Sequence, residues 1–354
     1  MHFFISDMSE LATMRNAERS CGAKMARLGK ALGAGFSVPR GFVLDVSACR
    51  EALEDPSVSD AITAAMEGID ERSTPEALAH VRPRVQSALE EFAIQDDLLE
   101  SLREACEALG EGARLAVRSS APGEDAHDAS FAGQFETTLG VVGFDAVMSA
   151  MRRCWSSPFS APALAYRASR GVLENAMPMA VGVLELVDAT VAGVAFSVHP
   201  VTRRRNRVVI EANWGLGETV VSGTVSPDHI EIGKTDLRIL DYAIGAKQHV
   251  AAFSASEGRV VDRVASPDEA SVRCLSDDEA MLVAATTVEL EDVFGHAVDV
   301  EWAIAPGLDG APSRLVVLQV RPVTIREEPM VVRSGYDPIG RILERTARKV
   351  PTGG

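Results

Sequence analysis

Hydrophobic residues recur along the first third of the chain at the intervals typical of helices. Met25, Leu28 and Leu32 are spaced as one face of a helix. Residues 41–46 follow a proline and form an apolar, extended segment. Across residues 47–110 apolar positions again recur at helical intervals, with acidic residues between them. This stretch is predicted to form helices with solvated acidic faces, and no function is attached to it.

Further along, the pattern changes to short apolar runs between polar turns, which is typical of strands. Strands are predicted over residues 115–117, 179–187, 191–197, 206–213, 298–304 and 315–321. Helices are predicted over residues 144–155, 161–170 and 278–294.

Length and charge limit what the protein can be. A chain of 354 residues can bury a sizeable core and is long enough for two or three lobes. Its 46% hydrophobic and 24% charged residues are ordinary for a globular protein. The net charge of −16 would repel nucleic acid and anionic membranes, so we expect neither as a partner. A polyphosphate site must then gather its positive charges locally.

The cysteines and the N-terminal residues indicate a cellular compartment. The 5 cysteines stand far apart without a CxxC pair, which is typical of reduced thiols. The start, MHFFISDMSE, lacks the pattern of a signal peptide, and no long apolar segment follows it. We therefore expect a soluble, cytoplasmic protein.

The predicted strand at residues 115–117 leads into candidate anion-binding chemistry. Arg118 follows it at once, then two serines and a polar loop that reaches Gly133. A guanidinium offers five fixed donors suited to phosphate, and a glycine lets backbone N–H groups approach an anion closely. From these residues alone, a phosphate-binding loop and a surface loop with one solvated arginine remain equally open.

The last two predicted strands form a second candidate site. Asp299 and Glu301 lie two apart on one strand and so share a face, while Gln319 and Arg321 lie on the other. Two carboxylates opposite an amide and a guanidinium could hold Mg²⁺ and a triphosphate. By residue pattern alone, a ladder of surface salt bridges is the favoured alternative.

A lysine near the start of the first predicted helix is the third candidate. Lys24 follows Gly22 and Ala23, where a lysine is ordinarily a solvated surface charge. No GxxxxGK[ST] string occurs, so this is not a Walker A loop.

Together these residues carry a resemblance to a known family. The string VRSSAPGEDAHDASFAGQFET, residues 117–137, closely resembles a signature of the nucleotide-binding domain shared by phosphoenolpyruvate synthase, pyruvate phosphate dikinase and rifampin phosphotransferase. The strings GAKMARLGKALGAGFSVPRGFV, IEANWGLGE, DVEWAI and LQVRPVT resemble further motifs of that domain in the same order. The resemblance covers roughly residues 20–325.

The resemblance implies an α+β fold of the ATP-grasp type. In that fold two lobes with mainly antiparallel sheets clasp a nucleotide and close over it. The N-terminal lobe is expected at residues 1–180 and the C-terminal lobe at residues 181–325. Residues 326–354 are charged and contain prolines, and we expect them to form a tail or docking segment.

The family motifs also imply roles for single residues. Lys24, Arg118 and Arg321 are the expected catalytic cations, which would neutralise the phosphates of ATP. Glu301 and Gln319 are the expected Mg²⁺ ligands, with phosphate oxygens completing the coordination.

The remaining ATP contacts that the resemblance implies lie around the phosphates and the adenine. Gly133 and Thr137 would close over the phosphates. The family usually has glutamine where this chain has Leu184, so the adenine edge would meet the backbone of Glu185 and Leu186 instead. Glu211 would point toward the nucleotide cleft.

The multidomain relatives pass phosphate from ATP to a histidine on a mobile domain, and from there to an acceptor. None of the 7 histidines here lies in the matching motif, so that histidine is expected on a partner subunit. The chain is thus expected to be the ATP-binding subunit of a split, dikinase-like phosphotransferase that cleaves ATP to AMP and phosphate. The arrangement resembles phenylphosphate synthase, which favours phenol as the acceptor and pyruvate next.

Three alternatives remain open. The chain could be the detached N-terminal part of an enzyme like phosphoenolpyruvate synthase or rifampin phosphotransferase. It could be a complete small-molecule or antibiotic kinase, although no acceptor domain is recognised. It could also be a non-catalytic ATP-binding module that regulates a partner.

Overall fold

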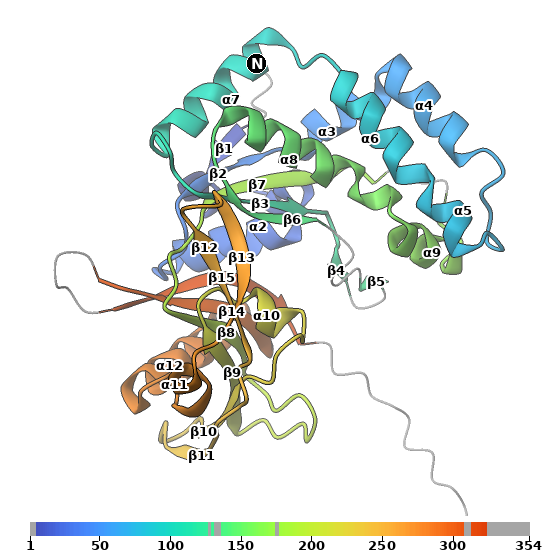
Figure 1. Cartoon of the computed structure of the whole chain (residues 1–354). Helices are drawn as coiled ribbons and strands as arrows, with labels where there is room; N and C mark the ends of the chain where they lie inside the picture. Colours follow the sequence, from blue (N-terminus) through green and yellow to red (C-terminus); the bar gives the residue numbers. More distant parts are fainter. Residues whose placement is uncertain (1–4, 127–128, 131–135, 174–176, 308–312, 324–354) are drawn as a thin grey trace, which may run out of the picture. The chain divides into compact units, whose positions relative to one another are not determined.

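The computed structural model describes residues 5–126, 129–130, 136–173, 177–307 and 313–323. The chain divides into two units, Met1–Val323 and Thr324–Gly354. The predicted tail at 326–354 and the predicted site residue Gly133 lie outside the described residues. Everything that follows concerns the first unit, shown in Figure 1.

Two antiparallel sheets form the framework of this unit. The first has the strand order β1-β2-β7-β3-β6, and every neighbouring pair in it is antiparallel. Its strands are β1 (Ile5–Asp7), β2 (Gly41–Leu44), β7 (Ala180–Glu185), β3 (Leu115–Ser120) and β6 (Thr137–Val141). Because β7 belongs to this sheet, the chain passes to the second sheet after Glu185, a few residues beyond the predicted lobe boundary at 180.

The second sheet has the order β11-β10-β9-β8-β14-β15, again antiparallel throughout. Its strands are β8 (Val191–Phe196), β9 (Arg207–Trp214), β10 (Asp228–Gly233), β11 (Ile239–Ala243), β14 (Val298–Ala305) and β15 (Arg314–Pro322). Two short pairs stand apart from the sheets: β4 (Asp125–Ala126) with β5 (Ala129–Ser130), and β12 (His249–Ser254) with β13 (Arg259–Val264).

Helices cover both faces of the first sheet. Alternate strand residues face two separate cores: Phe42, Leu44 and Val183 join one hydrophobic cluster, whereas Val43 and Leu184 join the other. Helices α3 to α8 contribute to the first cluster, and α2 to the second. Their bounds are α1 (Met8–Leu11), α2 (Ala17–Gly33), α3 (Val46–Glu54), α4 (Pro56–Met66), α5 (Pro75–Ala79), α6 (Val81–Glu91), α7 (Asp96–Ala108), α8 (Phe144–Ser156), η1 (Ser157–Phe159) and α9 (Ala161–Ser169).

Helix α2 packs against both sheets. Met25 and Leu28 share one hydrophobic cluster with Trp302 and Val317 of the second sheet, and α2 contacts β15 (Figure 1). Helix α12 (Asp277–Phe294) packs on the same face of the second sheet, because its residues belong to that cluster and Lys30 of α2 lies over the Phe294 ring at 4.6 Å. Helices α10 (Glu218–Val221) and α11 (Pro267–Ser271) are short. The first turns of α2 therefore lie at the border between the sheets.

The sequence-based expectations for the fold hold well. The α+β class and the mainly antiparallel sheets are confirmed. The extended segment predicted at residues 41–46 ends earlier, at Leu44, because Asp45 caps α3 through the backbone N–H of Ser47 at 2.6 Å. No helix in the described part of the chain is long and apolar enough to cross a membrane.

Candidate functional site

A cavity of about 420 Å³ lies where the two sheets meet. That volume falls within the range of small-molecule sites in proteins, about 300 to 1,000 Å³. Both sheets contribute to its wall. The predicted site residues that line it are Lys24, Arg118, Thr137, Glu185, Leu186, Glu301 and Arg321.

Arg118 reaches from the first sheet to the second. Its position on β3 alternates with the core residue Val117, so its side chain points away from the cluster formed with α3 to α8. Nη2 donates to Glu301 Oε2 at 3.0 Å and to Gln319 Oε1 at 2.7 Å, and Nη1 donates to the carbonyl of Leu318 at 3.0 Å. One guanidinium thus binds three oxygens of the β14–β15 hairpin.

A β-bulge exposes the carbonyl that Arg118 binds. The β14–β15 register pairs Glu301 with Gln319 but Trp302 with Val317, so Leu318 is the extra residue on β15. A bulge leaves such a residue outside the ladder and bends its strand locally. The Leu318 carbonyl therefore points to Arg118 instead of to β14.

The carboxylate and the amide predicted to hold Mg²⁺ are cross-strand partners. Glu301 pairs with Gln319, and Asp299 pairs with Arg321. Arg321 Nη2 lies 3.4 Å from Glu301 Oε1. Burial tends to raise the pKa of Glu301, but the positive charges of Arg118 and Arg321 outweigh it and hold that pKa below its ordinary value. Glu301 is therefore a carboxylate at neutral pH.

The oxygens of this hairpin suit a hard cation. Arg118 Nη2 donates to both Glu301 Oε2 and Gln319 Oε1. These two oxygens therefore lie close enough to bind one positive centre together. Among the described residues, no group of three or more His, Cys, Asp or Glu side chains could hold a metal by itself. Mg²⁺ fits such a sparse set, because it keeps several waters and shares phosphate oxygens.

Lys24 enters the cavity from a kinked helix. Gly22 has φ 72° and ψ 167°, so α2 breaks there and restarts at Ala23. The restarted turn is capped by the loop after β3: Ala23 N–H donates to the Ala121 carbonyl at 3.0 Å, and Met25 N–H to Ser120 Oγ at 3.2 Å. These bonds join two motifs that are far apart in sequence.

Buried donors without acceptors gather around this cluster. Arg118 Nε, Arg321 Nε and Gln319 Nε2 have no hydrogen-bond partner among the described residues. Unsatisfied buried donors are costly, and they are explained when a ligand supplies the acceptors. An anion with several oxygens would do so.

Apolar residues also line the cavity. They include Leu184, Leu186, Trp302 and Leu318, which suit a flat aromatic ring. The N–H of Leu186 donates to the Arg114 carbonyl at 2.7 Å, and that of Glu185 to the Arg40 carbonyl at 2.8 Å. A base contact from the backbone of Leu186 or Glu185 would therefore have to use a carbonyl.

Glu211 shares the sheet face with Glu301 but does not line the cavity. Cross-strand partners run in one row from Glu301 through Val194 and Glu211 to His229. Glu211 Oε1 lies 2.6 Å from His229 Nδ1. Glu211 is thus engaged beside the cavity, and His229 is a neighbour that the sequence did not indicate.

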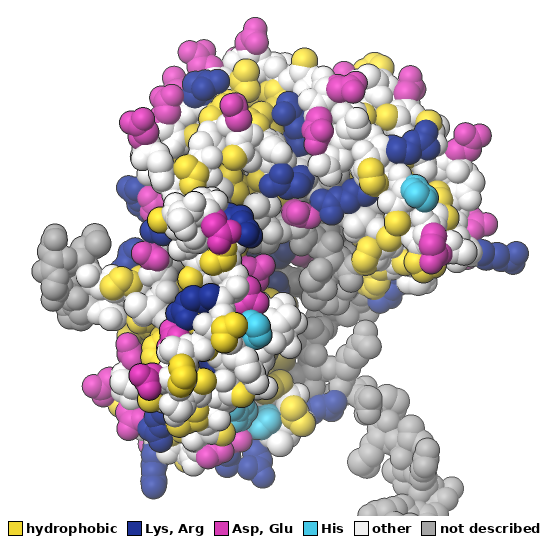
Figure 2. Space-filling view, viewed as in Figure 1, with side chains coloured by type: hydrophobic (Ala, Val, Ile, Leu, Met, Phe, Trp, Pro, Cys, Tyr) yellow, Lys and Arg dark blue, Asp and Glu magenta, His cyan; other side chains and the backbone are white. Residues whose placement is uncertain are grey.

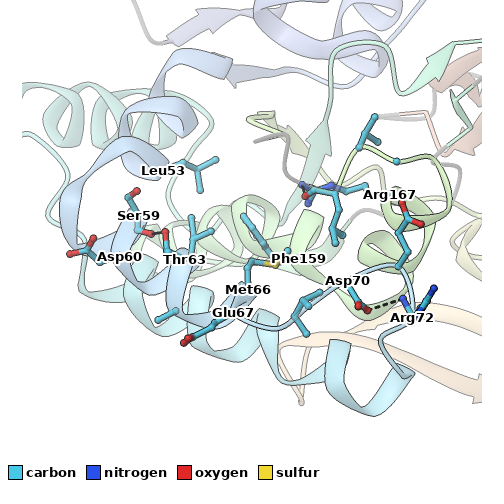
Figure 3. Close-up of a pocket in the computed structure, with 17 residues that line it drawn as sticks. Leu53, Ser59, Asp60, Thr63, Met66, Glu67, Asp70, Arg72, Phe159 and Arg167 are labelled. Carbon is cyan, nitrogen blue, oxygen red and sulfur yellow. Dashed lines mark hydrogen bonds between the residues drawn. The ribbon is translucent and has the colours of Figure 1, made fainter.

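The structure also contains a larger cavity, of about 1270 Å³, among the helices of the first lobe (Figure 3). Its wall combines apolar residues of α4 with Asp60, Glu67 and Asp70. Arg167, which also lines it, donates to the carbonyls of Pro158 and Leu173. None of the predicted site residues lines it, and its carboxylates would repel a polyphosphate.

The visible surface does not point to a polyanionic partner. On the face shown in Figure 2, basic and acidic side chains are interspersed and not separated by sign. The expectation that nucleic acid is not bound stays a prediction.

Comparison with known proteins points to one family. Residues 18–335 match the family model described as pyruvate phosphate dikinase, AMP/ATP-binding domain. The chain is 35% identical over 308 residues to a probable phosphoenolpyruvate synthase of Methanothermobacter thermautotrophicus, covering 86% of this chain and 44% of that protein.

Two further relatives show the same pattern. A probable phosphoenolpyruvate synthase of Methanocaldococcus jannaschii is 37% identical over 309 residues, covering 86% of this chain and 25% of the relative. The phosphoenolpyruvate synthase of Pyrococcus furiosus is 31% identical over 366 residues, covering 92% of this chain and 44% of the relative. The chain spans less than half the length of each of these relatives.

Proposed function

The chain belongs to the family of the pyruvate phosphate dikinase AMP/ATP-binding domain, and we propose that it binds ATP in the cavity between its two sheets. The observation that carries the proposal is the convergence of Arg118 with Glu301 and Gln319. A guanidinium from one sheet meets metal-type oxygens from the other beside one cavity; Arg118 and Glu301 line that cavity, and the buried Gln319 lies behind its wall. The apolar residues of the cavity wall would contact the adenine.

Each charged residue has a part in the proposed chemistry. Lys24 and Arg118 would bind phosphate oxygens from the first lobe, and Arg321 from the second. Glu301 and Gln319 would hold Mg²⁺, which when bound neutralises charge that develops on the transferred phosphoryl group. Phosphoryl transfer depends mainly on positioning and charge stabilisation, and this residue set provides both.

We further propose that the phosphoryl acceptor is brought to the cavity from elsewhere. Among the described residues, the cavity wall contains no histidine and no cysteine. The chain would act as the ATP-binding part of an ATP-dependent phosphotransferase. It would cleave ATP to AMP, with one phosphoryl group transferred to a histidine on a partner subunit or on a further domain and the other transferred to water and released as phosphate. Phenol, by the resemblance to phenylphosphate synthase, and pyruvate, by the names of the relatives, are the acceptors to test.

The decisive measurement is AMP release from ATP and Mg²⁺. The chain would be assayed alone and then with a histidine-bearing partner plus phenol or pyruvate. We expect AMP only when the partner is present, and the acceptor consumed would identify the overall reaction. AMP from the chain alone would mean that water or an internal group accepts phosphate. Bound ATP without AMP in either assay would contradict the phosphotransferase and favour a regulatory module.

A further inference from the structure

Lys24 lies in surroundings that are costly for an ammonium group. The residue is 5% exposed and stands in the first turn of the helical segment that restarts after Gly22. The N-terminal end of a helix carries partial positive charge and repels a cation. Burial adds the loss of hydration, so a buried ammonium group needs a paired anion.

Glu124 supplies that anion. Its Oε1 lies 2.6 Å from Lys24 Nζ, and the residue is only 2% exposed. Its Oε2 accepts from the backbone N–H of Ala121 at 3.3 Å, so the loop after β3 fixes the carboxylate. Lys24 Nζ also donates to the carbonyl of Ser119 at 3.4 Å. An ammonium has three N–H groups, and within the described residues one of them remains for a ligand.

Glu124 lies behind Lys24 as seen from the cavity. Lys24 lines the cavity together with Arg118 and Glu301, whereas Glu124 does not. A carboxylate in the wall itself would repel phosphate. One behind the ammonium instead fixes its position and compensates its charge.

We propose that Glu124 is a positioning residue, which holds the Lys24 ammonium at the cavity wall with one N–H left for a phosphate oxygen. The proposal rests on the ATP-binding function proposed above. Glu124 touches neither nucleotide nor metal and acts only through Lys24.

A double-mutant cycle on ligand binding tests this dependence. Affinity for a non-hydrolysable ATP analogue with Mg²⁺ would be measured for the wild type, E124Q, K24M and the double variant. We expect E124Q to weaken binding about tenfold in the wild-type background and not at all in the K24M background. Equal losses in both backgrounds, or unchanged or tighter binding in E124Q, would overturn the proposal.

A second cycle needs no nucleotide. The unfolding midpoints of the same four proteins would be measured in urea. Removing Glu124 alone leaves an uncompensated buried charge, whereas removing both partners does not. The double variant should therefore be more stable than E124Q, and a double variant that is less stable would contradict the pairing. This cycle also keeps the test valid if E124Q folds poorly.

The two cycles separate this proposal from the proposed function. A wild type that binds no nucleotide but shows the stability coupling would reject ATP binding and reduce Glu124 to a structural partner. A wild type that binds ATP with additive losses would reject the positioning role alone. E269Q is the matched control, because Glu269 pairs with the exposed Arg263 and does not line the cavity. It should leave affinity unchanged.

Discussion

Arg118 holds, through one guanidinium nitrogen, both oxygens that the proposed metal would need. Its Nη2 donates to Glu301 Oε2 and Gln319 Oε1. Phosphates and carboxylates compete for the same guanidinium donors. Binding of ATP with Mg²⁺ would therefore exchange partners, with the phosphate taking the guanidinium and the metal taking the oxygens. Metal and nucleotide are then expected to bind cooperatively.

The first prediction concerns the side chain of Arg118. R118A removes the charge and the donors, and we expect it to lower AMP formation by about a hundredfold or more. R118K keeps a charge but loses the planar fork, so it should recover little of that loss. AMP release with the partner present measures both. R263A, which removes an exposed arginine outside the cavity, is the control. Near-normal turnover in R118A would remove Arg118 from the mechanism.

At the residue scale, the sequence indicated the charged residues of the cavity but not the residues that hold them in position. Lys24, Arg118, Glu301 and Arg321 were singled out by the family resemblance, and all four line one cavity. Their roles in binding ATP stay predictions. Glu124 lies within the same signature, yet nothing in the local pattern indicates that its side chain turns back to Lys24.

At the scale of elements, irregular backbone shapes the site. Lys24 follows the kink at Gly22 and lines the cavity. The bulge at Leu318 leaves a carbonyl that accepts a hydrogen bond from Arg118. The spacing of Met25, Leu28 and Leu32 predicts the helix correctly, because core contacts follow its period. The kink and the bulge have no such period. Both lie where the chain contacts β3 or the residue after it, and local patterns do not contain such distant contacts.

The second prediction concerns the kink. An added Cβ at Gly22 would lie 2.1 Å from the Ser120 carbonyl oxygen, so the helix start would have to move away from β3. We expect G22A to lose about 2 kcal/mol of stability or more and to weaken ATP binding. G68A is matched in its positive φ, but an added Cβ there meets nothing within 4 Å. It should lose less stability and keep its affinity. Urea unfolding and calorimetry measure the two effects, and equal affinity in both variants would contradict the proposed link.

At the scale of the whole described unit, two separate hydrophobic clusters each hold cysteines. Cys21 and Cys274 lie in the cluster that joins α2 to the second sheet, and Cys49 and Cys154 in the helical one. Burial raises the pKa of the Cys21, Cys49 and Cys154 thiols to about 12, and raises that of Cys274 as well. Cys106 is less buried, and its pKa is about 11.

The third prediction follows from these pKa values. Thiol reagents attack the thiolate, so the folded protein at pH 8 should react slowly and first at Cys106. C106S should remove that first phase, whereas urea should expose all the thiols together. The thiols favour the folded state fully below their unfolded pKa of 9.0, and this contribution is lost as pH rises toward 12. Stability should therefore decline above pH 9. Rapid reaction of the buried thiols at pH 8 would contradict the burial shown here.

The general fold was the part of the molecule that the sequence predicted best. The apolar run of residues 180–184 became strand β7 because both of its faces are covered. The order of the strands in the sheet could not be predicted from the hydrophobic pattern. It depends on contacts between distant parts of the chain, such as those that place β7 between β2 and β3.

That insertion sets an order of events during synthesis on the ribosome. β2 and β3 are made early, but neither can complete its pairing until β7, which ends at Glu185, has been translated. Until then β2 and β3 each present an unpaired edge, which invites pairing with other chains. The helices between β2 and β3 can form meanwhile from local contacts. The nascent chain should therefore depend most on chaperones just before β7 emerges, and become resistant to proteolysis soon after.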